Sequence, residues 1–345
     1  MTTVKPTRCA IAATLPDWIR SKVSRWLCGV LFVLCTSGSP VYAQFIETFV
    51  ASTGSDTNNC STVPLACRSF GHALTQTFSG GQITVLDSAD YGVASITGGI
   101  SIINDSAGTA TNALSANGFG GVSGMVYIDA GSSDTVTLRG LVLNAETFSG
   151  NPSFNGLLIN NAQRVNIENC TILNAPGSGI LVSPGVQPAT LPPVINISIQ
   201  NTTVNGNSAG VKVASTVSAP VNITIAGSHI DNNFGGGVRV DGGSGGPITI
   251  SIVDSTVSHN GGNGLNAVSN ASNVMVNLLR DVIGVNGAAG IQANGASAAV
   301  VVNNTALLNN ATALSAIGGG RILTYGNNSI VGTAGSSFTG TASLQ

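Results

Sequence analysis

A repeat of 26 to 27 residues runs through residues 194–293 and limits the folds that this chain can adopt. Four blocks share one outline: alternating apolar residues, a second short apolar element, an Asn, and then a Gly with an apolar–polar–apolar triplet. A fixed period of this size is typical of solenoids, in which each repeat stacks on the last. The Gly marks are Gly210, Gly237, Gly264 and Gly290, and the Asn marks are Asn207, Asn233, Asn260 and Asn286.

Apolar and polar residues alternate inside each block, which is the pattern of a half-buried β-strand. Ile195, Ile197 and Ile199 alternate with Asn196 and Ser198, and β-branched residues dominate, as strands prefer. Leucine-rich repeats have a similar period, but they need a Leu and Asn consensus that these blocks lack. The sequence therefore predicts an all-β solenoid, a parallel β-helix with several strands in each coil.

The Asn and Gly marks fall where each coil must turn. Both residue types accept left-handed backbone conformations at low cost, and amides stacked one per coil can hydrogen-bond along the axis. We interpret Asn207, Asn233, Asn260 and Asn286 as a structural turn ladder and expect Asn309 to continue it. The alternative is a row of polar ligands, but turn chemistry already explains these positions.

The repeats resemble those of secreted bacterial right-handed parallel β-helix proteins, in the pectin-lyase-like superfamily. The resemblance extends from about Phe49 to the last residue. It implies a right-handed parallel β-helix. It implies little about activity, because one such scaffold carries lyases, hydrolases and adhesins.

The first 43 residues have the pattern of an export signal. Five Lys and Arg residues precede an apolar run at 26–35, and Val41-Tyr42-Ala43 offers a cleavage site before Gln44. The apolar run is shorter than the roughly 20 residues that a membrane-spanning helix needs. We expect no transmembrane span and a secreted, periplasmic or cell-surface protein.

The charge balance argues against nucleic acid as a partner. Removal of residues 1–43 takes away five of the 12 basic and one of the 14 acidic residues, which leaves a net charge of −6. Such a chain has no electrostatic attraction for nucleic acid or an anionic membrane. Charged residues are only 8% of the chain, but the regular apolar alternation still predicts a buried core rather than disorder.

The remainder is expected to be one continuous domain. Residues 44–103 would form the N-terminal cap and the first coils, 104–123 a loop rich in Gly, Ala, Ser and Asn, and 124–345 the further coils and the C-terminal tail. A solenoid needs caps at its ends. Residues 68–79 predict a capping helix, because Phe70, Leu74 and Phe78 form one apolar stripe.

Three cysteines lie outside the expected leader. Cys60 and Cys67 flank a short loop that contains Pro64, which predicts a disulfide in an oxidising compartment. Cys170 lies in an alternating strand pattern and is expected to be a buried core residue.

Patterns for catalysis or metal binding are hard to find. Polysaccharide hydrolases of the resembled family carry paired Asp residues, whereas the repeats contain no adjacent carboxylates for glycoside cleavage. Calcium, zinc and phosphate-loop spacings are also missing, so we expect no metal and no cofactor. His229 and His259 each precede a turn and are not assigned a catalytic role. The acids in the repeats, Asp231, Asp241, Asp254 and Asp281, are spread one or two per coil.

The second residue after each Gly mark should point outward, so that these residues form a row roughly 5 Å apart. Lys212 and Arg239 in this row, with Asp241 beside them, would offer a small polar platform for an acidic sugar. The other interpretation is an ordinary solvated strand face, on which Arg239 and Asp241 form an inert ion pair. The remaining members of the row are Leu158, Leu181, Asn266 and Gln292.

Two functions of different classes fit these observations. The first is an exported β-helix protein without an evident catalytic site, which serves in surface attachment, adhesion or the binding of a polysaccharide or cell-surface glycan. The alternative is a polysaccharide lyase or glycoside hydrolase of the same superfamily with a non-standard site. The missing motifs and the few charged side chains favour the first.

Overall fold

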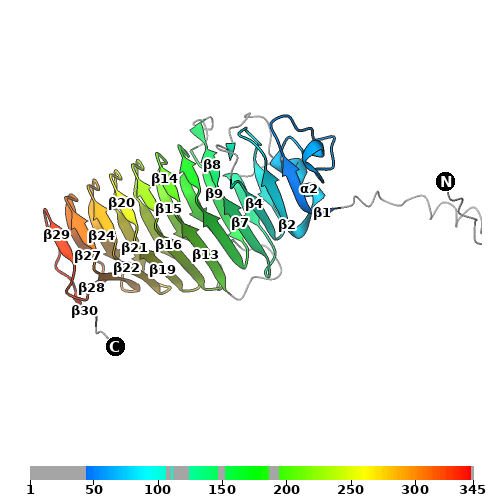
Figure 1. Cartoon of the computed structure of the whole chain (residues 1–345). Coiled ribbons are helices and arrows are strands. Elements are labelled where there is room, and N and C mark those ends of the chain that lie inside the picture. The colour runs from blue at the N-terminus through cyan, green and yellow to red at the C-terminus, as the bar shows by residue number, and fades with distance from the viewer. Residues whose placement is uncertain (1–43, 106–109, 112–123, 147–151, 186–193, 343–345) are drawn as a thin grey trace, which may run out of the picture. The chain divides into compact units, whose positions relative to one another are not determined.

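The computed structural model describes residues 44–105, 110–111, 124–146, 152–185 and 194–342 (Figure 1). Residues Gln44–Gln345 form one compact unit. The predicted export signal at residues 1–43 lies outside the described residues. So does most of the expected loop at 104–123, where the short strand β5 (Ala110–Thr111) is an element that the sequence did not predict.

Each complete coil contributes one strand to each of three parallel sheets. In one coil, β13 (Ile195–Gln200) lies in the first sheet, β14 (Thr203–Asn205) in the second and β15 (Ala209–Ala214) in the third. Among the described residues, the first sheet has twelve strands and the other two have nine each. Neighbouring strands in every sheet come from successive coils, which is the arrangement of a β-helix (Figure 1).

The other strands of the first sheet are β1 (Phe45–Val50), β2 (Thr77–Val85), β4 (Ile100–Ile103), β7 (Thr135–Arg139), β10 (Arg164–Glu168), β16 (Val221–Ala226), β19 (Ile248–Val253), β22 (Val274–Leu279), β25 (Ala298–Asn303), β28 (Arg321–Thr324) and β30 (Gly340–Thr341). Those of the second sheet are β5, β8 (Leu141–Asn144), β11 (Thr171–Leu173), β17 (His229–Asp231), β20 (Thr256–Ser258), β23 (Val282–Gly284), β26 (Ala306–Leu308) and β29 (Ser329–Val331). Those of the third sheet are β3 (Ala94–Ile96), β6 (Gly124–Asp129), β9 (Asn155–Asn161), β12 (Ser178–Val182), β18 (Val238–Gly242), β21 (Leu265–Ser269), β24 (Ala289–Asn294) and β27 (Thr312–Ile317).

Inward residues of the first sheet form a continuous apolar stack. Ile197 pairs in register with Val165 on one side and Ile223 on the other, and all three side chains are buried. Full burial of one such side chain stabilises the fold by about 1.5 to 3 kcal/mol. The alternation read from the sequence therefore separates a dry interior from an outer polar face. The stack comprises Val136, Val165, Ile197, Ile223, Ile250, Val276, Val300 and Ile322.

The four Asn marks lie one above another in the turn between the second and third sheets. The Nδ2 group of Asn207 donates to Oδ1 of Asn233 at 3.0 Å, and Asn233 and Asn260 repeat this bond to the next coil at 2.9 and 3.0 Å. Oδ1 of Asn233, Asn260 and Asn286 also accepts the backbone N–H of the preceding ladder Asn, as in the 3.1 Å bond from Asn260 to Asn286, and Oδ1 of Asn207 accepts the N–H of Ala175 at 2.9 Å. All four amides are buried, so the ladder satisfies polar groups that have no access to water.

The expectation that Asn309 continues this ladder is wrong. Asn286 donates instead to Oδ1 of Asn310, at 2.8 Å. Asn309 has a positive φ of 51° and occupies the left-handed position that precedes the ladder residue. Two adjacent Asn residues thus divide the two tasks of the turn, backbone conformation and axial hydrogen bonding.

A second buried ladder occupies the turn between the first and second sheets. Ser228 N–H donates to Oγ of Ser255 at 3.1 Å, and Ser255 N–H donates to Oδ1 of Asp281 at 2.9 Å. Thr202 and Thr305 hold the equivalent positions on either side. Asp281 is therefore a structural carboxylate, and its burial raises its pKa to about 6.

The predicted capping helix is present but shorter than expected. Helix α2 spans Phe70–Gln76, and the side chain of Ser69 caps it by accepting the His72 N–H at 3.2 Å. Phe70 is buried, whereas Phe78 lies in β2 and is exposed. Pairing of β2 with β1 draws the chain into the sheet from Thr77 onward, so the expectation of a helix to Ser79 is wrong. No helix within the described residues is long and apolar enough to cross a membrane.

Cys60 and Cys67 are joined by a disulfide, with their Cα atoms 5.0 Å apart. The bond closes the loop that contains the short 3₁₀ helix η1 (Val63–Leu65). Both cysteines are buried beneath the N-terminal cap. The disulfide therefore closes this loop, and backbone hydrogen bonds between Phe49 and the two cysteines hold the loop against β1.

The Asn ladder predicts a large cost for the loss of one central amide. Asn260→Ala removes axial bonds to Asn233 and Asn286 and leaves their buried partners unpaired, which should lower the free energy of unfolding by at least about 2 kcal/mol. Asn277→Ala, on the outer face of β22, should change it by no more than about 0.5 kcal/mol. Urea unfolding of both variants measures this, and equal midpoints would contradict the ladder's role.

The raised pKa of Asp281 predicts a pH-dependent stability term. Because the folded protein holds this proton more tightly than the unfolded chain, the term is fully present below about pH 4 and is lost as pH rises through about 6. Asp281→Ser restores the hydroxyl found at Ser228 and Ser255 and should remove the term. The stability of the variant relative to the parent should then rise by roughly 2 kcal/mol between pH 4 and 7. A difference that does not change with pH would refute this origin of the term.

Candidate functional site

The third sheet places the predicted row on its outer face. Lys212 on β15 pairs in register with Arg239 on β18, which pairs with Asn266 on β21. Strand pairing places these residues at one strand spacing, about 4.8 Å. We call the four residues Lys212, Arg239, Asn266 and Gln292 the polar row.

The row continues beyond the residues counted from the sequence. On one side Lys212 follows Leu181, Leu158 and Tyr127, and on the other Gln292 pairs with Ser315. Tyr127 escaped the sequence count because its coil precedes the regular Gly marks. Its hydroxyl has a raised pKa, through burial and the nearby Asp129 carboxylate. The outer face of the third sheet therefore changes from aromatic and apolar to cationic and then to amide side chains.

Arg239 and Asp241 form an ion pair along one strand. Nε of Arg239 lies 2.9 Å from Oδ2 of Asp241, and a second guanidinium nitrogen lies 2.7 Å from Oδ1. Arg239 remains about half exposed. The pair orients the guanidinium and leaves Lys212 as the cation of the row that has no ion pair with a described residue.

Asn266 departs from the expected exposure. Its side chain is only 9% exposed, and its Oδ1 atom is buried without a hydrogen-bond partner within the described structure. A buried amide oxygen without a donor is rare and costs about 1 to 3 kcal/mol. Asn266 lies between Arg239 and Gln292 in the polar row.

A second polar cluster, which the sequence did not predict, lies on the outer face of the second sheet. Oδ1 of Asp231 accepts from both the N–H and the hydroxyl of Ser258, at 2.8 and 2.7 Å. Thr256 Oγ1 donates to Oδ2 of the same carboxylate at 3.2 Å. Nδ1 of His229 lies 2.8 Å from Thr256 Oγ1, and Nδ1 of His259 lies 3.1 Å from Ser258 Oγ. The two histidines thus border one carboxylate through two hydroxyl groups.

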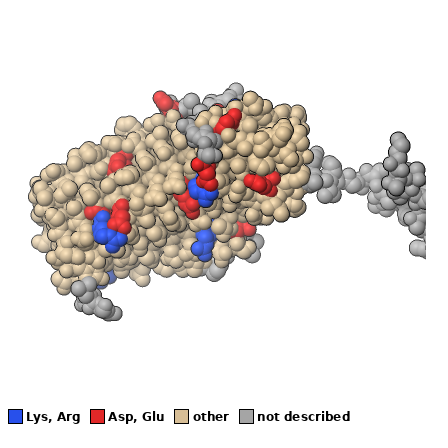
Figure 2. Space-filling view, in the orientation of Figure 1, with Lys and Arg blue, Asp and Glu red and all other residues tan. Residues whose placement is uncertain are grey.

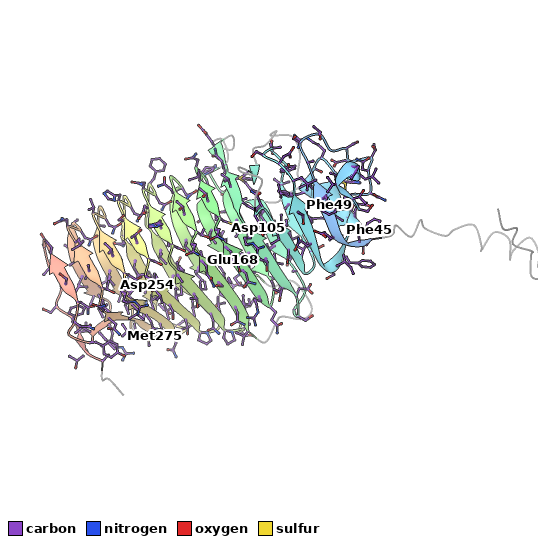
Figure 3. All side chains as sticks on the ribbon, in the orientation of Figure 1. Phe45, Phe49, Asp105, Glu168, Asp254 and Met275 are labelled. Carbon is purple, nitrogen blue, oxygen red and sulfur yellow. A yellow bond between two sulfur atoms is a disulfide. The ribbon has the colours of Figure 1, made fainter. Side chains whose placement is uncertain are left out.

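Three other acids, Asp105, Glu168 and Asp254, form surface ion pairs with arginines. Arg139 contacts Asp105 at 2.5 Å and Glu168 at 3.8 Å, and Arg280 contacts Asp254 at 2.7 Å. Figure 3 shows Asp105, Glu168 and Asp254 following one another along the solenoid, and Figure 2 shows adjacent acidic and basic patches on a mostly uncharged surface. Hydrogen bonds from the arginines lower the pKa values of Asp105 and Asp254.

The three cysteines that the structure describes, Cys60, Cys67 and Cys170, are a bonded pair and a buried thiol. Among the described residues, Cys60, Cys67 and His72 bring three ligand atoms within 4.8 Å of one another. The two sulfurs are bonded to each other, and His72 Nε2 lies 2.9 Å from the carbonyl oxygen of Asn58. Cys170 is buried, as expected, and desolvation raises its pKa to about 11. A neutral buried thiol is a poor nucleophile.

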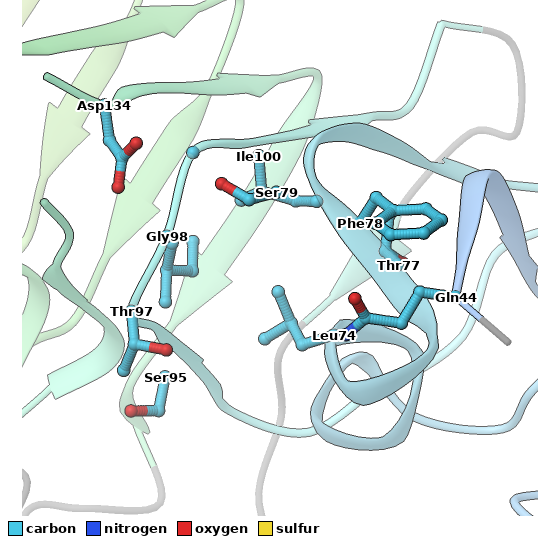
Figure 4. A pocket seen from close by; sticks show the side chains of 12 residues that line it. Gln44, Leu74, Thr77, Phe78, Ser79, Ser95, Thr97, Gly98, Ile100 and Asp134 are labelled. Carbon is cyan, nitrogen blue, oxygen red and sulfur yellow. The ribbon is translucent and has the colours of Figure 1, made fainter. Parts of the chain in front are cut away.

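Two depressions lie away from the polar row. One of about 350 Å³ borders the N-terminal cap, where Figure 4 shows Leu74 and Phe78 on one side and Asp134 on the other. A second, of about 470 Å³, is bordered by Phe234, whose side chain is 81% exposed. Phe234 directly follows the ladder residue Asn233, where the equivalent residues are Ser208 and Gly261. An aromatic residue at a position that neighbouring coils fill with small residues is a signal the sequence analysis missed.

Comparison with known proteins agrees with the architecture. A family model described as a right-handed beta helix region matches residues 82–250. No curated protein matches the chain. Among solved structures, the pectate lyase Pel9A is similar with a TM-score of 0.46 and 12% identity, over 87% of this chain and 80% of that one. The GH136 lacto-N-biosidase from Eubacterium ramulus has a TM-score of 0.41 and 12% identity, over 86% of this chain and 66% of that one.

The strand order, the parallel register and the matched family model lead to one conclusion. Every pairing between named strands in the described residues joins equivalent strands of successive coils. The chain is a right-handed parallel β-helix protein.

Proposed function

We propose that this protein is exported and binds carbohydrate along the polar row of the third sheet without cleaving it. The observation that carries the proposal is the alignment of Lys212 and Arg239 with the unpaired, buried Oδ1 of Asn266. Export is supported by the signal-like pattern of residues 1–43. A solenoid that engages a long ligand typically does so along its stacked repeats.

The chemistry of the row suits an acidic polysaccharide. Lys212 and Arg239 supply N–H donors for a carboxylate, and Asn266 Oδ1 supplies an acceptor for a sugar hydroxyl. Gln292 is already bonded to Asn263 at 3.2 Å and to Ser315 at 3.3 Å, so it is held in place on the strand. Neighbouring strands present these groups at regular intervals, as a polymer with regularly spaced groups requires.

Binding without turnover is supported by the carboxylates near the row. Glycoside hydrolysis generally uses two carboxylic acids on either side of the scissile bond. Asp241 is the carboxylate beside Lys212 and Arg239, and it is held by Arg239. Both oxygens of this carboxylate are engaged by the guanidinium of Arg239, so neither is free to contact a scissile bond.

A second candidate is a polysaccharide-active enzyme centred on Asp231. The observation that favours it is the network of Ser258, Thr256 and the two histidines around that carboxylate. Carboxylate and imidazole groups are side chains that enzymes use as general acids and bases. Assays for new reducing ends and for unsaturated uronides decide between the two functions, because turnover of any polymer would contradict the proposal of binding alone.

Loss of both cations should weaken binding. Lys212→Ala with Arg239→Ala should reduce affinity for acidic oligosaccharides at least tenfold, since charge-assisted hydrogen bonds contribute about 1.5 to 3 kcal/mol each. The remaining binding should depend less on salt. Isothermal titration calorimetry measures both, and Arg321→Ala, a cation on the first sheet, is the matched control. Equal affinities for the double variant and the control would refute the row as the site.

Asn266 offers an independent test, because its unpaired oxygen should lower the stability of the fold while it contributes to ligand binding. Asn266→Leu removes the unpaired buried oxygen and should raise the free energy of unfolding by about 1 kcal/mol. The same change should weaken oligosaccharide binding, because the acceptor is lost. Thermal melts with and without ligand provide the comparison. A variant that is less stable, or that binds as tightly as the parent, would show that this oxygen does not serve the ligand.

A further inference from the structure

A shallow hollow on the outer face of the first sheet is a second polar surface, separate from the polar row. It has a volume of about 290 Å³ and spans the three neighbouring strands β10, β13 and β16. Outward side chains on these strands pair in register as two parallel lines, so that the hollow is bordered by a grid of two residues per strand. The grid consists of Arg164, Asn166, Asn196, Ser198, Asn222 and Thr224, and Ile197 also lines the hollow.

Arg164 supplies the charge of this hollow. Its side chain is exposed, and within the part of the chain that the structure describes no acidic group forms an ion pair with it. This distinguishes it from Arg139, Arg239 and Arg280, each of which binds a carboxylate. The guanidinium therefore keeps its donors available for an anion.

The neighbouring amides are held in place and retain free hydrogen-bonding groups. Asn222 Nδ2 donates to Asn196 Oδ1 at 3.3 Å, which fixes one line of the grid. Asn166 Nδ2 donates to Thr137 Oγ1 at 3.2 Å, in the second line. Each amide has two donor hydrogens and an acceptor oxygen, so one such bond leaves further groups directed at solvent. Sugar hydroxyls both donate and accept hydrogen bonds, so they can pair with the donors and the acceptors of these amides.

We propose that this hollow is a second saccharide site, which binds a sugar that carries one anionic group. The anion lies at Arg164, and the hydroxyls of the same and the next sugar meet Asn196, Asn222 and Thr224. The volume is close to the lower end of the range for ligand pockets, which fits one sugar ring rather than a deeply enclosed ligand. The inference concerns a different sheet from the polar row and does not depend on it.

The chain contains matched controls for every part of this site. Arg321 lies in the same outward line as Arg164, reached through Thr249, Met275 and Ala299, but it is outside the hollow. Thr249 and Ser251 continue both lines on β19, also outside the hollow. Figure 3 labels Met275 beyond these residues on the same sheet.

The test is calorimetric titration with a trimer of glucuronic acid and with the same trimer methyl-esterified. It is performed on the full chain carrying Lys212→Ala and Arg239→Ala, so that the polar row does not contribute. Adding Arg164→Ala should weaken binding of the acidic trimer at least tenfold, while Arg321→Ala should leave it within about twofold. Asn196→Ala with Asn222→Ala should weaken both trimers, whereas Thr249→Ala with Ser251→Ala should weaken neither.

Three outcomes would overturn the proposal. Arg164→Ala and Arg321→Ala could have equal effects, the acidic trimer could fail to bind in this background, or sodium sulfate could compete at the same concentration as the trimer. The last result would identify a simple anion site. Thermal melts show that each variant is folded. Failure of the polar row appears separately, as unchanged binding on replacement of Lys212 and Arg239 alone.

Discussion

The axial hydrogen bonding of buried amides is the interaction on which the rest of the structure depends. Asn233 and Asn260 are removed from water, so their amide groups are satisfied only when the next coil presents another amide at the same height. A coil that slipped by one residue would leave these groups unpaired and would turn its inward Ile and Val residues outward. The ladder therefore holds the coils between Asn207 and Asn310 in register.

The same register determines what the surface can bind. Outward residues at equivalent positions form straight lines one strand spacing apart, so a functional group placed once per coil becomes a periodic array. Three of the described arginines, Arg139, Arg239 and Arg280, form ion pairs with carboxylates. Lys212 and Arg164 are cations for which the described residues provide no ion pair. Lys212 lies between Leu181 and Arg239 in the polar row, whereas Arg164 lies among amide and hydroxyl side chains. Polar surfaces of this kind suit extended, hydroxyl-rich ligands better than compact ones.

The local alternation of apolar and polar residues was enough to predict the coils. Features that depend on packing between distant residues could not be predicted from the sequence. Alternation placed Ile197 inside, and counting from the Gly marks placed Lys212 beside Arg239, because both follow from the strand period and the repeat. The apolar stripe that includes Phe78 is compatible with a longer helix, but pairing of β2 with β1 places Phe78 in a strand. Sequence could not distinguish Asn309 from Asn310, since backbone conformation assigns their roles. The burial of Asn266 and the partners of Asp231 depend on residues from other coils, and no local pattern records them.

The central claim is that the polar row of the third sheet binds an acidic saccharide and thereby satisfies Asn266. A crystal structure of the protein with a bound acidic oligosaccharide tests it most directly. The account predicts a sugar carboxylate within hydrogen-bonding distance of Lys212 or Arg239, and a sugar hydroxyl that donates to Oδ1 of Asn266. A saccharide seated around Asp231 instead, or one on the row that leaves Asn266 Oδ1 without a donor, would contradict it.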